Sequence, residues 1–258
     1  MFKHPYLIKD LNKIDKNFNH FKYKEIDFFL KVKDSNKFLI VYLHGAIYNN
    51  HKTNKPIKTP IFYHWNYDYP NCDSLCLSDK LLEDYYENNL LLSWYLSTPK
   101  NNYFEIYIEI ITYILQKKYK KVLFTGGSGA GYPAIIFSSY FKKNCLIFNP
   151  QIYLDKYFYF ENMLEILKIQ KEDIEYNIET FINKHGSPNN ILLIVNIRDE
   201  IHYKEHALYF ENYMKNNNNN IMTLYFKGPN PPKKKDFHHD QIPENTTYHK
   251  LIFKALFQ

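Results

Sequence analysis

The chain alternates short apolar runs with longer segments in which apolar residues recur every three or four positions. Continuous apolar runs are typical of strands covered on both faces, and the longer period is typical of helices. The predicted strands are residues 25–32, 37–43, 74–78, 121–125, 145–148, 190–196 and 221–226. The predicted helices are residues 103–117, about 129–141, about 203–215 and 244–257. This order predicts an α/β fold whose mostly parallel sheet has helices on both faces.

Two features refine this outline. The first two strands, joined by Asp34, Ser35 and Asn36, are expected to be neighbours in the sheet. Residues 151–186 have helical periodicity and no strand pattern, which predicts a helical insertion after the strand that follows the 129–141 helix. Such an insertion either caps a site or adds a packing helix pair. Because no Pro/Gly/Ser-rich linker divides the chain, we expect residues 1–258 to form a single domain.

The composition narrows the function class. Hydrophobic residues make up 45% and charged residues 23% of the 258 residues, which is ordinary for a globular protein. The net charge is +6, but Arg198 is the only arginine, so base-specific nucleic-acid recognition is not expected. A phosphate-bearing or polyanionic ligand remains compatible with the positive charge.

The three cysteines, Cys72, Cys76 and Cys145, are too few for a disulfide framework or a complete zinc site. The N-terminal segment lacks the apolar stretch of a signal peptide, and no run approaches a membrane span. We therefore expect a cytoplasmic protein with reduced thiols, no metal and no stable membrane insertion. A homo-oligomer is left open.

The most informative string is KVLFTGGSGAGY at residues 121–132, which places Ser128 between a buried strand and a helix. A sharp strand-to-helix turn brings the positions two before and two after the serine together, so both must be small, as Gly126 and Ala130 are. Ala130 departs from strict G-x-S-x-G by one methyl group. A phosphate-binding loop or a plain tight turn are the alternatives, but no lysine follows Gly131 as in a P-loop. The string favours Ser128 as a nucleophile.

A nucleophilic serine needs a base and an orienting carboxylate, and both are expected after later strands. Asp199 follows the 190–196 strand by three residues and is the preferred acid; Glu200 and Asp155 are alternatives. His239 lies in the loop between the last strand and the last helix and is the preferred base. Its neighbour His238 is the alternative. The chain order Ser128, Asp199, His239 is the order expected for this architecture.

The strand at 37–43 ends in His44, Gly45 and Ala46. The amide of Gly129 and that of Ala46 or Gly45 are predicted to form the oxyanion hole. His44 is a candidate substrate-binding residue. Three lysines on the loop of the predicted base are candidates for contacting coenzyme A phosphates or an anionic glycan: Lys233, Lys234 and Lys235.

Taken together, LHGA near residue 43, GGSGAG around Ser128, NPQ at 149–151, NIRDEIH at 196–202 and HHD before the last helix resemble α/β-hydrolase-fold enzymes. More narrowly, they resemble bacterial capsule polysaccharide O-acetyltransferases, over roughly residues 37–257. The resemblance implies an α/β-hydrolase-like fold in which Ser128 takes acetyl from acetyl-CoA and passes it to a sugar hydroxyl of a polysaccharide or glycan acceptor. Asp199 would be the acid and His239 the base.

Two other functions fit the same residues. An esterase or deacetylase with the same triad would resolve the acyl-serine with water. A non-catalytic glycan-binding or scaffold protein is the option outside enzymes, because fold alone does not fix function.

Overall fold

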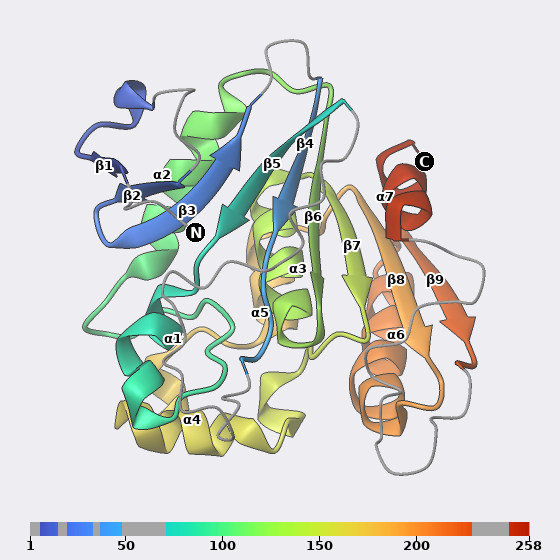
Figure 1. The fold of residues 1–258 in the computed structure, drawn as a ribbon. Helices are drawn as coiled ribbons and strands as arrows, with labels where there is room; N and C mark the ends of the chain where they lie inside the picture. Colours follow the sequence, from blue (N-terminus) through green and yellow to red (C-terminus); the bar gives the residue numbers. More distant parts are fainter. Residues whose placement is uncertain (1–5, 15–19, 33–36, 48–70, 229–247, 258) are drawn as a thin grey trace. The chain divides into compact units, whose positions relative to one another are not determined.

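A computed structural model describes residues 6–14, 20–32, 37–47, 71–228 and 248–257 (Figure 1). The described residues divide into two compact units. The first unit comprises Met1–Lys121 and Tyr159–Tyr176, and the second comprises Val122–Phe158 and Asn177–Gln258. Each unit combines strands and helices.

The strands of the first unit lie in the order β1-β2-β3-β5-β4. Their bounds are β1 Tyr6–Ile8, β2 His20–Tyr23, β3 Ile26–Lys31, β4 Phe38–Tyr42 and β5 Cys72–Leu77. β5 pairs parallel with β4 and antiparallel with β3, so β3 and β4 are not neighbours. The prediction that these two strands lie side by side was wrong. β5 is buried at all six positions, which favours a place inside the sheet between two partners.

The helices of the first unit are α1 Lys80–Tyr85, α2 Tyr103–Leu115 and α4 Tyr159–Leu167. α2 begins where the Asn102 side chain accepts a hydrogen bond from the Glu105 amide, and it buries its apolar stripe. α4 is held by ring packing of Phe160 on Trp94, with centroids 6.2 Å apart. The α2 prediction is confirmed within two residues.

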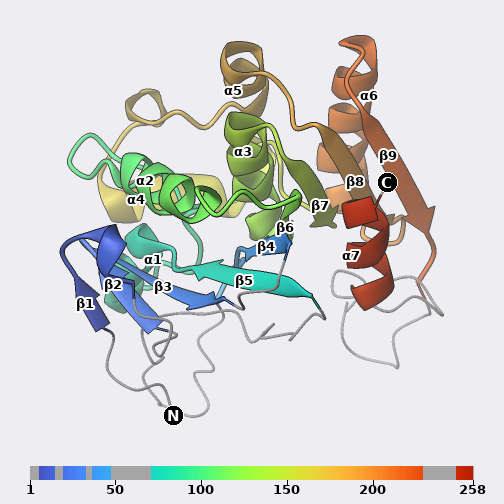
Figure 2. The ribbon, with the colours of Figure 1, turned by 90° about the horizontal axis from the view of Figure 1, so that it is seen from above.

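The strands of the second unit lie in the order β6-β7-β8-β9, and all of their pairings are parallel. Their bounds are β6 Lys121–Gly127 (its first residue belongs to the first unit), β7 Asn144–Phe148, β8 Asn190–Asn196 and β9 Ile221–Phe226. Helices α3 Gly131–Phe141, α5 Ile178–His185, α6 Leu208–Asn216 and α7 Tyr248–Phe257 complete the unit. α3 and α7 both contact β7, and they lie on opposite faces of this sheet (Figure 2). Because the strands are parallel, their carboxyl ends share one edge.

The strand-free character predicted for residues 151–186 is confirmed, since this fully described stretch forms α4, α5 and short 3-10 turns. α5 packs on α3 within the second unit, whereas α4 belongs to the first. The role of this segment as a cap stays a prediction.

Cys72, Cys76 and Cys145 are free and buried, and burial raises the pKa of each thiol to about 12. None of the helices in the described part of the chain has both the length and the apolar character that crossing a bilayer requires.

Candidate active site

Ser128 occupies a backbone conformation that few L residues adopt. Its φ is +55°, at the point where β6 gives way to a 3-10 turn and then to α3. A Cβ built on Gly126 would lie 2.6 Å from Cβ of Ala130, and one on Gly131 would clash with Pro150. The turn therefore requires small residues on both sides of the serine, as the sequence pattern predicts.

The Ser128 side chain is half-buried, while the next two residues are buried. A left-handed non-glycine residue costs on the order of 1–3 kcal/mol and persists only where its surroundings enforce it. Here the turn is confined by the close approach of Gly126 to Ala130 and of Gly131 to Pro150. The turn presents one hydroxyl at the carboxyl edge of the second unit's sheet.

Gln151 donates two hydrogen bonds to Ser128. Its main-chain N donates to the Ser128 carbonyl at 3.0 Å, and its side-chain Nε2 donates to Ser128 Oγ at 3.2 Å. The side chain is only 1% exposed. Gln151 follows β7, so it links the ends of two neighbouring strands at the serine.

Asp199 and His202 form a close pair beside Gln151. Asp199 Oδ1 lies 2.7 Å from Nδ1 of His202, and His202 Nε2 lies 3.5 Å from Nε2 of Gln151. The His202 ring is 7% exposed. A carboxylate that accepts from Nδ1–H leaves Nε2 as the basic nitrogen, which is the orientation a general base requires. Asp199, His202 and Gln151 thus form a polar chain that ends on Ser128 Oγ.

A π-helical turn, His202–Ala207, precedes α6 and carries a second histidine. His206 is fully buried, and its Nδ1 accepts from the amides of Ile152 and Tyr153 at 3.3 and 3.2 Å. Its Nε2 has no hydrogen-bond partner among the described residues. Burial lowers the pKa of His206 to about 3, with the nearby His202 adding to the effect. This neutral ring fixes the segment that directly follows Gln151.

Two buried asparagines connect the ends of the strands that carry these residues. Asn149 Oδ1 accepts from the Asn196 amide at 2.7 Å, which ties the end of β7 to the end of β8. Asn196 Oδ1 in turn accepts from the amides of Arg198 and Gly228, at 3.1 and 3.2 Å. Asn196 is fully buried and so holds the turn before Asp199 against the segment that follows β9.

The structure separates the three acid candidates. Asp199 is bonded to His202, whereas Glu200 is exposed and pairs with Lys204 at 2.8 Å. Asp155 is exposed in a 3-10 turn. Only Asp199 of the three is joined to the polar chain that reaches Ser128.

Several predicted residues lie outside the described part of the chain. They are the base candidates and the basic loop: His238, His239, Lys233, Lys234 and Lys235. Their roles stay predictions.

The predicted oxyanion and substrate residues after β4 belong to the first unit. His44 is 3% exposed, with Nδ1 bonded to Gly45 O at 3.1 Å and Nε2 accepting from the Asp79 amide at 3.1 Å. Burial lowers the pKa of His44 to about 4. Both ring nitrogens are thus engaged by the protein main chain, which suits a residue that shapes its loop. Gly45 and Ala46 are half-buried, and their role as amide donors stays a prediction.

Sequence reasoning missed Gln151, His202 and His206 as site residues. The signal for the histidines is their spacing of four, directly after Asp199, which places both on one side of a helical turn. Gln151 ends the NPQ string on which the resemblance partly rests, but that string assigned it no role.

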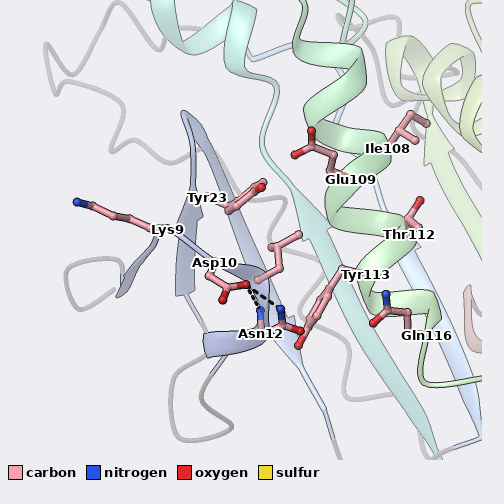
Figure 3. Close-up of a pocket in the computed structure, with 10 residues that line it drawn as sticks. Lys9, Asp10, Asn12, Tyr23, Ile108, Glu109, Thr112, Tyr113 and Gln116 are labelled. Carbon is pink, nitrogen blue, oxygen red and sulfur yellow. Dashed lines mark hydrogen bonds between the residues drawn. The ribbon is translucent and has the colours of Figure 1, made fainter.

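A cavity of about 470 Å³ in the first unit contains none of these residues (Figure 3). It is lined by the segment that follows β1, which includes Asp10, by Tyr23 of β2 and by one side of α2. Its carboxylates have partners inside the unit: Asp10 accepts from Asn12, and Glu109 accepts from Lys24 at 2.8 Å. The residues of the polar chain that reaches Ser128 therefore do not line this cavity.

No family model and no curated protein sequence matches the chain. Several solved structures are similar to it. A chain of the glycosylation-associated Gap123 complex from Streptococcus agalactiae is 13% identical, with a TM-score of 0.52 over 79% of this chain. Est2, a thermophilic esterase from Thermogutta terrifontis, is 12% identical, with a TM-score of 0.50 over 90% of this chain and 85% of its own. An acylaminoacyl peptidase from Pyrococcus horikoshii is 17% identical, with a TM-score of 0.50 over 81% of this chain.

The present chain spans only 40% of the Gap123 chain and 37% of the peptidase. At identities this low the likeness concerns the fold alone. Together with the mostly parallel strand pairings, it gives this chain an α/β-hydrolase-like fold, as the sequence predicts.

Proposed function

We propose that the chain is a serine-dependent acyltransferase that uses Ser128 as its nucleophile. One observation carries the proposal. The Ser128 hydroxyl stands on a left-handed turn between β6 and α3 and is joined through Gln151 to the Asp199–His202 pair. A tight phosphate loop or a plain turn needs no carboxylate–imidazole pair beside it.

In the first half-reaction, an imidazole takes the proton from Ser128 Oγ, and Oγ forms a bond to the carbonyl carbon of a thioester. The negative charge that develops on the carbonyl oxygen is stabilised by the amide of Gly129 and by a second amide, that of Ala46 or Gly45. One such donor is typically worth about 3 kcal/mol. The C–S bond then breaks, the thiol leaves with the proton from the imidazole, and acyl-Ser128 remains.

In the second half-reaction, the imidazole takes the proton of a sugar hydroxyl, whose oxygen attacks the acyl-Ser128 ester. The tetrahedral species collapses, Ser128 Oγ regains a proton from the imidazolium, and the O-acyl sugar leaves. Asp199 holds the imidazole in one tautomer throughout.

The base is an imidazole oriented by Asp199. Among the described residues this is His202, whose Nδ1 lies on the carboxylate. His239 is the base predicted from chain order and lies outside the described residues. Replacing His202 and His239 in separate variants distinguishes the two candidates. The variant that lacks the true base loses both half-reactions, whereas the other variant still forms the acyl-enzyme.

The proposed donor is acetyl-CoA and the proposed acceptor is a capsular or surface polysaccharide. The resemblance of the GGSGAG, NPQ and HHD strings to those of capsule polysaccharide O-acetyltransferases supports this choice of donor and acceptor. The glycosylation-associated structural neighbour supports a glycan acceptor. Lys233, Lys234 and Lys235 would meet the coenzyme A phosphates or an anionic glycan.

The test is thiol release from acetyl-CoA, measured with and without a capsule-type glycan. We expect release that depends on the glycan and that Ser128→Ala abolishes. Release that is equally fast without glycan would instead establish a hydrolase, the function suggested by the esterase neighbour. No release and no labelling of Ser128 by a serine-directed phosphonate would leave only a non-catalytic glycan-binding or scaffold role.

A further inference from the structure

We propose that the Gln151 carboxamide fills the place in which water would attack acyl-Ser128, and that it thereby favours transfer over hydrolysis. This inference rests on the proposed function with His202 as the base, because it concerns the fate of the acyl group on Ser128. It assigns Gln151 the part of a specificity-determining residue.

The geometry places one atom between nucleophile and imidazole. Gln151 Nε2 lies 3.2 Å from Ser128 Oγ and 3.5 Å from Nε2 of His202. The residue is 1% exposed, and its own amide is bonded to the Ser128 carbonyl at 3.0 Å. The carboxamide is therefore anchored in a space that both reacting groups border.

Hydrolysis of an acyl-serine needs a water molecule that touches the basic nitrogen and faces the acyl carbon attached to Oγ. Such a water molecule needs room and polar partners. In this site the carboxamide takes both the room and the partners. A carboxamide nitrogen is itself no nucleophile, because its lone pair is delocalised into the carbonyl. The acyl group is thus shielded while no acceptor is bound.

A sugar acceptor differs from water in what it brings to the site. It has further hydroxyl groups and ring surface, and the binding energy from those parts can move one side chain aside before reaction. Water has no such binding energy. The same displacement lets a bound acyl donor reach Ser128 in the first half-reaction.

Two substitutions separate the volume of Gln151 from its hydrogen bonding. Gln151→Ala opens space beside Oγ, whereas Gln151→Met keeps an unbranched side chain of similar length without the amide donor. Both variants keep the main-chain N–H that donates to the Ser128 carbonyl. Gln151→Ser opens the same space if the alanine variant does not fold.

The experiment follows acyl-Ser128 by intact-protein mass spectrometry after brief exposure to p-nitrophenyl acetate and removal of the excess reagent. We expect the adduct of Gln151→Ala to decay roughly tenfold faster than that of the wild type, and the adduct of Gln151→Met to decay at nearly the wild-type rate. A Gln151→Ala adduct that decays at the wild-type rate or more slowly overturns the inference but leaves the proposed function intact. Failure of the wild type to form any adduct on Ser128 overturns both.

Discussion

A single backbone angle at Ser128 depends on the size of its neighbours. The serine keeps φ at +55° because Gly126 and Ala130 approach each other more closely than two larger residues can. Ala130 in place of glycine fits because its methyl group is buried against Gly126, which offers no side chain. This explains why one departure from the G-x-S-x-G pattern is tolerated while a second methyl group at position 126 would not be.

Adjacent glycines provide a matched test. In Gly126→Ala the new methyl group would lie 2.5 Å from the Ala130 carbonyl oxygen, so we expect a loss of about 1–3 kcal/mol in the free energy of unfolding and a loss of Ser128 reactivity. In Gly127→Ala the nearest atom is 3.5 Å away, which is ordinary contact. Urea denaturation of both variants is the measurement. Equal stability of the two would show that the turn is not size-limited.

His206 makes a prediction about pH. Its pKa is lowered from 6.5 to about 3, so between these values the unfolded chain binds a proton that the folded protein does not. The stability that depends on the neutral ring is complete above pH 6.5 and is lost as the pH falls toward 3. From pH 7 to pH 5 the loss from this one group amounts to about 2 kcal/mol.

The control is His206→Asn, whose side-chain oxygen can accept from the same amides without titrating. His44 and Asp79 titrate in both proteins, so their opposite contributions cancel in the difference. We expect the variant to lose less stability than the wild type between pH 7 and pH 5, as measured by urea denaturation. Parallel losses in the two proteins would contradict a buried neutral His206.

At the scale of elements, the carboxyl ends of β6, β7, β8 and β9 are joined by side-chain amides. Gln151 joins β7 to the serine turn, Asn149 joins β7 to β8, and Asn196 joins β8 to Gly228 after β9. Main-chain hydrogen bonds continue for only a few residues past the ends of parallel strands, as from the Ile197 amide to the Phe226 carbonyl, so side chains satisfy other amides there. These amides also set where Asp199 lies.

Asn196→Leu is expected to reduce the rate of Ser128 acylation by roughly tenfold or more, because the turn that carries Asp199 loses two anchoring hydrogen bonds. Asn144→Leu is the matched control. Asn144 is also buried and hydrogen-bonded, but it lies at the opposite end of the strands, where it donates to Ala255 O at 3.0 Å. Both variants should lose stability, and only the first should slow acylation at saturating acyl donor. Equal effects on acylation would make Asn196 a merely structural residue.

Two strands have the bounds that the sequence predicts. Six of the seven positions of β8 are buried, because a parallel strand covered on both faces needs an unbroken apolar run. β9 is the outer strand, and all of its positions are half-buried or exposed. β1, β2 and α1 span three, four and six residues, too few for a periodic pattern to show. His202 was not predicted, because this architecture places the expected base in the loop after the last strand. The π-helical turn that buries His202 and His206 has no pattern of its own.

At the scale of the whole molecule, the polar chain from Asp199 to Ser128 lies entirely within the second unit. The sequence singled out two members of this chain, Ser128 and Asp199, since the elbow pattern and the end of a buried strand are local features; their catalytic roles stay predictions. The second oxyanion amide was predicted from the first unit, and local patterns carry no information on how such distant segments meet. The similar solved structures include an esterase and a peptidase, so one fold carries different reactions.

The most direct measurement is peptide mapping by mass spectrometry after brief exposure of the wild type and of Ser128→Ala to acetyl-CoA. An added mass of about 42 Da, one acetyl group, is expected on the peptide that contains Ser128 and is expected to be absent from the variant. Acetylation that survives Ser128→Ala, or a wild-type protein that turns over acetyl-CoA through a different residue, would contradict the account.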